Sequence, residues 1–153
     1  MPFSPGSQNN PGSKHYFPTP VIKPGSVIHS YSNQAGKIKR TIILATTDDG
    51  VLALTAYFNT TKPFKHIKHL AALQFHLKAE GNKFLEYDSY VNCAHPEVKQ
   101  MEEIRDAVKR KPSIYLSDLD KKKLDKIRTT VMNSPTVSRR IVKQFGLQDY
   151  LLK

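Results

Sequence analysis

The fold is decided by the stretch SVIHSYSNQAGKIKRTIILATTDDGVLALTAYF, which covers residues 26–58. Its apolar and β-branched residues form short runs separated by polar residues and glycines, a pattern typical of consecutive strands. Asp49-Gly50 lies between two such runs, and Asp-Gly in that position is a strong signal for a hairpin turn. The stretch predicts strands over residues 26–31, 40–46 and 51–58, with a polar loop over residues 32–39.

The residues that follow predict two further strands. These strands are expected over residues 73–78 and 84–93, and Gly81-Asn82 supplies the turn between them. Five short and closely linked strands are enough for a small barrel or a strongly curled sheet. The fold class predicted from this pattern is therefore α+β, because helical signals take over after Cys93.

The segment after Cys93 has apolar residues at helical spacing and clear helix start and stop signals. A first helix is expected to start at His95-Pro96-Glu97 and to stop before Pro112. A short apolar link over residues 114–116 precedes a sequence that resembles a capping box, Ser117-Asp118-Leu119-Asp120. Further helices are expected after this sequence and from Ser134-Pro135 to Gly146.

The N-terminal segment differs in composition from the rest of the chain. Six of the ten prolines and three of the seven glycines lie in the first 25 residues, with few apolar side chains between them. Such a segment cannot bury enough apolar surface to offset its ordering entropy. We therefore expect a flexible tail over residues 1–20 and a single domain over residues 21–153, made of a barrel (21–93) and a helical extension (94–153).

Composition excludes several classes of protein. The chain has 153 residues and a formal net charge of +11, with one cysteine, Cys93, so a disulfide framework is not possible. Its apolar runs are far shorter than the roughly 20 residues that span a bilayer, and the N-terminus does not look like a signal peptide. We expect a cytoplasmic protein without membrane contact, and the charge favours an anionic partner such as nucleic acid.

One basic segment stands out between the third and fourth expected strands. It contains Lys62, Lys65 and Lys68 together with His66. With Lys37 and Lys39 from the polar loop, these lysines are candidates for binding RNA phosphates. The alternative interpretation is a solvated lysine-rich edge that protects a strand from pairing with another chain.

Cleavage of RNA without a metal requires a proton acceptor near the 2′-hydroxyl, a proton donor for the leaving oxygen, and cations for the phosphate. Arg40 opens a strand, and Thr60 with Thr61 follows another. Candidates for proton transfer are His29, His66, His69, Asp88 and Tyr90, of which Asp88 and His66 are selected. Each also has a structural alternative: a surface arginine, turn-forming threonines and a turn aspartate. No complete set of metal ligands is apparent, so neither a metal nor a cofactor is expected.

The order of these elements resembles the MazF/PemK-like toxin family over residues 23–93. The resemblance is carried by KPGSVIHSY (residues 23–31), the glycine-containing loop, RTIIL (residues 40–44) and Thr60-Thr61. It implies an SH3-like barrel of about five strands with added helices, which forms a homodimer, cleaves single-stranded RNA without a metal and is inhibited by an antitoxin. In this resemblance Arg40 stabilises the phosphate, and Thr60 or Thr61 binds or polarises the scissile group.

The chain also departs from the family pattern. Thr41 replaces the proline that usually follows the arginine, and Asn92 and Ala94 stand where some members have a catalytic arginine and aspartate. The sequence therefore leaves open a second function, a non-catalytic SH3-like module that binds RNA or an acidic protein. A third is a structural or regulatory protein whose helical extension docks to a partner.

Overall fold

The computed structural model describes residues 19–151, so most of the predicted tail lies outside the described residues. Seven strands lie in the described part of the chain, and they are β1 (Ser26–Ser32), β2 (Lys37–Thr46), β3 (Leu52–Asn59), β4 (Gln74–Leu77), β5 (Ser89–Asn92), β6 (Glu97–Gln100) and β7 (Tyr115–Asp118). The helices are α2 (Lys68–Ala71), α3 (Met101–Arg110), α4 (Lys121–Met132), α5 (Arg139–Gln144) and α6 (Leu147–Leu151). The α+β class with C-terminal helices is confirmed.

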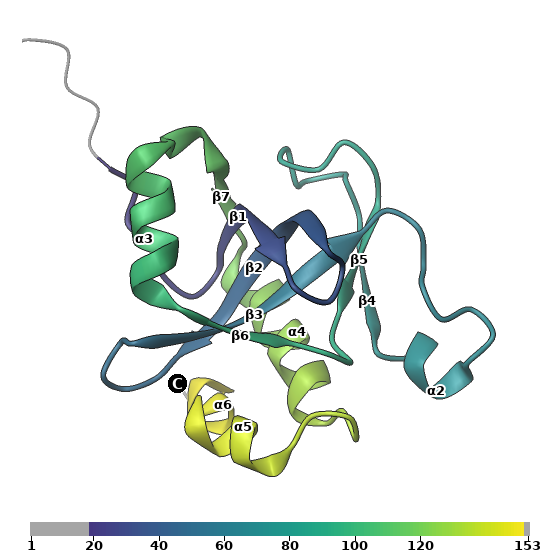
Figure 1. Cartoon of the computed structure of the whole chain (residues 1–153). Coiled ribbons are helices and arrows are strands. Elements are labelled where there is room, and N and C mark those ends of the chain that lie inside the picture. The colour runs from purple at the N-terminus through teal and green to yellow at the C-terminus, as the bar shows by residue number, and fades with distance from the viewer. Residues whose placement is uncertain (1–18, 152–153) are drawn as a thin grey trace, which may run out of the picture.

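The strands form one antiparallel sheet that is not closed into a barrel (Figure 1). Its order is β4-β5-β3-β2-β1-β7, and β6 pairs with the first half of β3. The expected barrel is therefore wrong. The physical reason is that β1 and β2 bury neighbouring residues on both faces, such as Val27 and Ile28, whereas a small closed barrel buries only its inner face.

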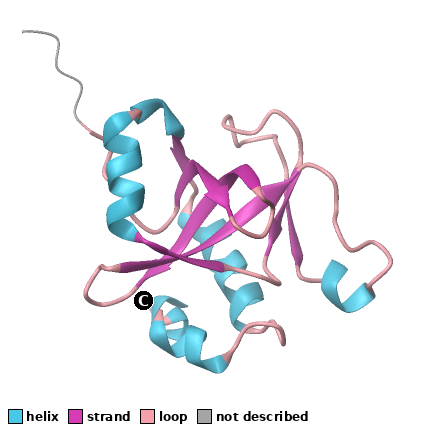
Figure 2. Cartoon of the chain, in the orientation of Figure 1, coloured by secondary structure: helices cyan, strands magenta, loops and turns pink. Residues whose placement is uncertain are grey.

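Helices cover both faces of this sheet (Figure 2). On one face α3 contributes Met101, Ile104 and Val108 to a small core around Ile28 and Ile43. The opposite face carries the larger core, where α4 and α6 pack against the strands. Its members from the helical side are Leu124, Ile127, Val131, Phe145 and Leu147.

The three strands predicted from residues 26–58 are confirmed, with small shifts at their ends. The largest shift is in β2, which begins at Lys37 instead of Arg40, so the predicted polar loop is shorter. The fourth strand is also confirmed, whereas β5 covers only four of the ten residues expected to be extended. Thr47 and Asp49 hydrogen bond to each other in the predicted Asp-Gly turn, and Gly50 adopts a φ of 73°.

The start of the first predicted helix is wrong. Residues Glu97–Gln100 form β6, because the edge of β3 at Leu52–Thr55 offers unpaired backbone groups, and α3 begins at Met101. The predicted link over residues 114–116 contributes to β7, which pairs with β1 for the same reason. The helix expected from Ser134 begins instead at Arg139, where the Ser138 side chain accepts a hydrogen bond from the Ile141 amide.

Candidate functional site

The candidate site lies at the hairpin formed by β1 and β2. The two strands pair so that His29 lies opposite Arg40, and Ser30 lies opposite Lys39. Residues that lie directly opposite in an antiparallel pair place their side chains on the same face of the sheet. The hairpin therefore brings a histidine and an arginine together on one face.

This end of the hairpin borders a pocket of about 340 Å³, which we call the cationic pocket. The pocket is lined by His29, Lys37, Ile38, Lys39, Arg40, Phe58, Asn59, Thr60 and Ser89. Most of its lining comes from the two strands of the hairpin, and the end of β3 supplies Phe58 and Asn59. Four residues predicted as site residues from the sequence, Lys37, Lys39, Arg40 and Thr60, thus lie around one pocket.

Within residues 19–151, the cations of the cationic pocket have no ion-pair partner. Among the described residues, no carboxylate lies within 4.0 Å of a charged nitrogen of Lys37, Lys39 or Arg40. The Nε atom of Arg40 is buried and has no acceptor within hydrogen-bond distance in the described part of the chain. A buried donor without a partner is unfavourable, and an anion in the pocket would satisfy it.

Lys39 is held by two side chains of β3. Its Nζ donates a hydrogen bond to Asn59 Oδ1 at 2.8 Å and lies 5.4 Å from the centroid of the Tyr57 ring. Burial lowers the pKa of Lys39, and the nearby charge of Lys37 lowers this pKa further. A lysine with a lowered pKa gives up its proton more readily than a solvated one.

His29 is the lining residue whose ionisation lies closest to neutral pH. Burial lowers its pKa from 6.5, and the positive charges of Arg40 and Lys111 lower this pKa further. The neutral imidazole therefore predominates at pH 7, and a neutral imidazole can accept a proton. Arg40 lies on the same face of the hairpin as this proton acceptor, while Lys37 and Lys39 belong to alternate positions of β2 and also line the pocket.

The hairpin turn is fixed by side chains from β6. Glu97 Oε2 accepts a hydrogen bond from Ser32 Oγ at 2.5 Å, and its carboxylate also accepts from the amides of Asn33 and Gln34, each at 3.3 Å. Lys99 Nζ donates to the carbonyl oxygen of Tyr31 at 2.5 Å and lies 3.6 Å from Glu97 Oε1. These contacts hold the turn that precedes the lysines of the cationic pocket.

The other predicted site residues do not line the cationic pocket. Asp88 accepts a hydrogen bond from the Ala79 amide at 2.8 Å and lies 3.5 Å from His76 Nε2, so it joins the loop after β4 to the start of β5. Thr61 follows the pocket residue Thr60 but is not part of the lining. Four more predicted residues are also absent from the lining, namely Lys62, Lys65, His66 and Lys68. They belong to the segment between β3 and β4 that contains α2, which Figure 1 shows beside β4.

The end of β5 has a structural role instead of a chemical one. Asn92 is buried, and its Oδ1 accepts hydrogen bonds from Gln74 Nε2 at 3.0 Å and from the Ala94 amide at 3.1 Å.

Burial raises the pKa of the Cys93 thiol to about 12, so the thiol stays protonated at neutral pH. No group of three or more potential metal ligands of the histidine, cysteine or carboxylate type occurs within residues 19–151.

Among the polar residues of the pocket, Asn59 and Ser89 were not predicted from the sequence, and His29 was only one of several candidates for proton transfer. The strand register could have placed His29 opposite Arg40, because the length of the turn between β1 and β2 determines which residues pair. Asn59 and Ser89 sit at strand ends, and only the packing of β3 beside β5 brings them to the hairpin.

The fold and the site together define an α+β protein with a cationic pocket at the end of its central hairpin. No protein-family model matches the sequence, and a search of curated proteins finds no significant match. Within residues 19–151, none of the helices has the length and apolar character needed to cross a membrane.

Proposed function

We propose that the protein is an endoribonuclease that cleaves single-stranded RNA without a metal, using the cationic pocket. The observation that carries the proposal is a pocket lined by three cations, Lys37, Lys39 and Arg40, which have no ion-pair partner within residues 19–151, and by the proton acceptor His29 opposite Arg40. A phosphodiester supplies the negative charge that these cations lack, and RNA supplies a nucleophile, the 2′-hydroxyl, next to each phosphate.

The proposed reaction uses the pocket residues as follows. Arg40 and Lys37 bind the non-bridging oxygens of the phosphate and stabilise the charge that develops on them. His29 takes the proton of the 2′-hydroxyl as its oxygen bonds to phosphorus, and the bond from phosphorus to the 5′-oxygen breaks. The ammonium of Lys39 gives its proton to the leaving oxygen, so the products are a 2′,3′-cyclic phosphate and a 5′-hydroxyl. Thr60 can donate a hydrogen bond to the phosphate.

The resemblance to MazF/PemK-like toxins supports this proposal. It places Arg40 and Thr60 at the phosphate, and both of them line the cationic pocket. A homodimer and an inhibitory antitoxin belong to the same proposal. Each of these stays a prediction that follows from the resemblance.

A second function is favoured by a specific observation, namely that no carboxylate from the described part of the chain lines the cationic pocket. The positions at which some family members have a catalytic arginine and aspartate are occupied by Asn92 and Ala94, which are both buried. These two features favour a non-catalytic module that binds single-stranded RNA through the same cations.

The test uses purified full-length protein, mixed-sequence single-stranded RNA and EDTA, with mapping of the fragment ends. Arg40→Gln should abolish cleavage, whereas Arg140→Gln, an exposed arginine on α5, removes the same charge away from the pocket and should cleave normally. A 2′-deoxy version of the RNA should bind and stay intact, because the nucleophile is missing. RNA that binds but is never cut would favour the second function, and RNA that does not bind would overturn both.

A further inference from the structure

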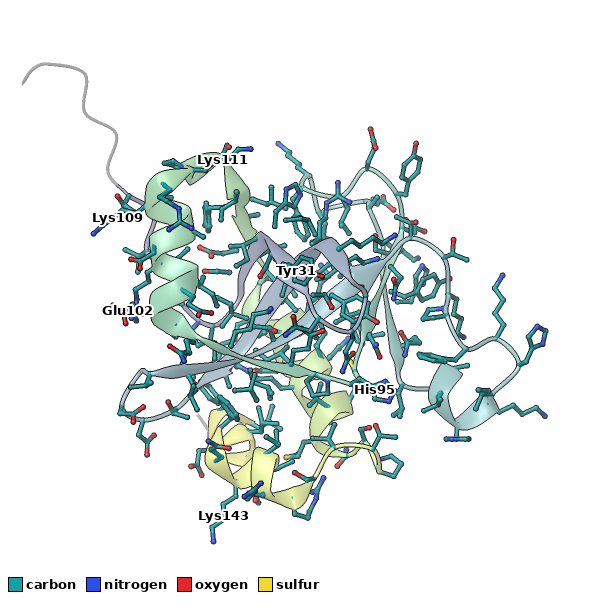
Figure 3. The ribbon with its side chains drawn as sticks, viewed as in Figure 1. Tyr31, His95, Glu102, Lys109, Lys111 and Lys143 are labelled. Carbon is teal, nitrogen blue, oxygen red and sulfur yellow. The ribbon has the colours of Figure 1, made fainter. Side chains whose placement is uncertain are left out.

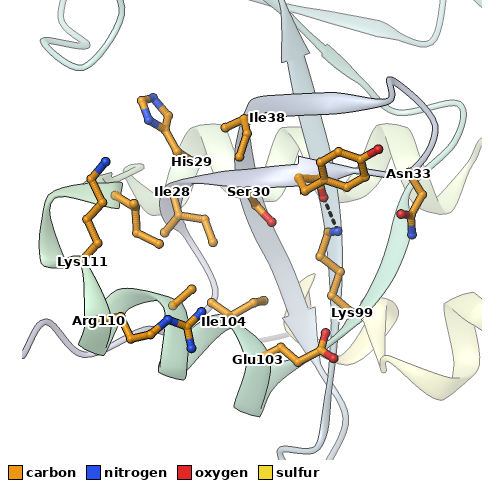
Figure 4. A pocket seen from close by; sticks show the side chains of 13 residues that line it. Ile28, His29, Ser30, Asn33, Ile38, Lys99, Glu103, Ile104, Arg110 and Lys111 are labelled. Atoms are coloured by element: carbon orange, nitrogen blue, oxygen red, sulfur yellow. Dashed lines mark hydrogen bonds between the residues drawn. The ribbon is translucent and has the colours of Figure 1, made fainter.

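A second cavity lies next to the cationic pocket, between β1 and α3, and we call it the β1–α3 groove. Its volume is about 520 Å³. In Figure 4, His29 and Ile38 lie on the strand side of the groove, and Glu103, Ile104 and Arg110 lie on the helix side. The remaining lining residues are Ile28, Ser30, Tyr31, Asn33, Lys99, Ala107, Lys111 and Ile114.

The two cavities share part of their walls. His29 and Ile38 line both the cationic pocket and the β1–α3 groove. A polymer whose phosphate is bound in the first cavity can therefore place the neighbouring group in the second, on the other side of His29.

The lining of the groove is mainly apolar but its rim is charged. The buried residues Ile28 and Ile104 contribute to the lining, while Tyr31 and Ile38 are 52% and 63% exposed, which is high for large apolar side chains. Arg110 and Lys111 stand at the end of α3, where Figure 3 shows Lys111. Neither has a carboxylate within 4.0 Å in the described part of the chain.

We propose that the β1–α3 groove binds the nucleobase next to the phosphate held in the cationic pocket. A nucleobase has two apolar faces and a polar edge, and proteins bind the faces by stacking on aromatic rings and on arginine guanidinium groups. Tyr31 and Arg110 offer such groups, and Asn33 and Glu103 can hydrogen bond to the edge. The inference rests on the proposed function, because the phosphate site must bind RNA for the base to reach the groove.

The test measures binding of two fluorescently labelled oligomers of equal length and charge, at low ionic strength and with 2′-O-methyl sugars to prevent cleavage. One oligomer carries bases and the other is abasic at every position. Wild-type protein should bind the base-bearing oligomer about tenfold more tightly than the abasic one, as expected for one stacked base. Arg110→Gln and Tyr31→Ala should each reduce this ratio severalfold.

Arg105→Gln is the matched control, because Arg105 is also exposed on α3 but does not line the groove. It should leave the ratio unchanged. Equal affinity of wild-type protein for the two oligomers would overturn the groove inference while the phosphate site stands. Equal ratios for the Arg110→Gln and Arg105→Gln variants would also overturn it. Failure of both oligomers to bind would instead refute the proposed function.

Discussion

Replacing Glu97 should loosen the hairpin that carries the cationic pocket. The Glu97 carboxylate accepts a hydrogen bond from the buried Ser32 hydroxyl and from two backbone amides of the turn, and it lies 3.6 Å from Lys99 Nζ. Glu97→Ala removes all of these contacts at once. Glu97→Gln keeps an acceptor oxygen for Ser32 but replaces the other carboxylate oxygen, which accepts from the Asn33 amide and faces Lys99, with an uncharged NH2 group.

The magnitude follows from how far each contact is shielded from water. The side chains of Glu97 and Lys99 are only 11% and 15% exposed, so their pairing is screened less than a surface ion pair. Hydrogen bonds to charged groups contribute about 1.5–3 kcal/mol. The amides of Asn33 and Gln34 belong to exposed residues, so water replaces the carboxylate there at little cost. We expect a loss of about 3 kcal/mol for Glu97→Ala and about 1 kcal/mol for Glu97→Gln.

Urea unfolding, followed by circular dichroism, measures these losses. With a slope of about 2 kcal/mol/M, the midpoint should fall by about 1.5 M for Glu97→Ala and about 0.5 M for Glu97→Gln. Glu86→Ala is the control and should not shift the midpoint, because Glu86 is exposed and forms no ion pair with another of residues 19–151. An unchanged midpoint in Glu97→Ala, or no faster amide hydrogen exchange at Asn33 and Gln34, would refute the role of Glu97.

Three further predictions concern single side chains. Because folding lowers the pKa of His29, the unfolded chain binds a proton at this histidine at a higher pH than the folded protein does, and the free energy of unfolding should fall as the pH drops below about 6.5. Urea midpoints at several pH values should show this fall, and the fall should be less steep in His29→Gln. Cys93, which is buried with a thiol pKa raised to about 12, should react with iodoacetamide at least about 100-fold more slowly in native protein than in urea. Arg128→Ala should cost about 3–5 kcal/mol in urea unfolding, because the guanidinium is buried and binds both the Leu44 carbonyl and Asp125.

Local signals made the central strands predictable. The Asp49-Gly50 turn and the apolar runs on either side of it act over a few residues, and β2 and β3 formed as expected. The four-residue strands β6 and β7 have no such signal. Their backbone pairs with β3 and β1, which lie far away in the sequence, and Pro96-Glu97 at the start of β6 is equally typical of a helix start.

The sequence predicts those residues of the candidate site that lie near the ends of strands. Lys37, Lys39, Arg40 and Thr60 are of this kind, and they line one pocket. His29 was harder to find, because a shift of one residue in the register would move its side chain to the opposite face from Arg40. The β1–α3 groove could not be predicted at all, since it exists only where the helix packs beside the strand.

The irregularity in β2 links the central strands to a C-terminal helix. The register between β2 and β3 shifts around Leu44, and the Leu44 carbonyl accepts a hydrogen bond from Arg128 of α4 at 2.8 Å. The sheet therefore depends on a helix that is made much later in synthesis. We expect a chain shortened to end before Leu119 to remain unfolded, and the full chain to unfold in a single cooperative transition in which strands and C-terminal helices are lost together.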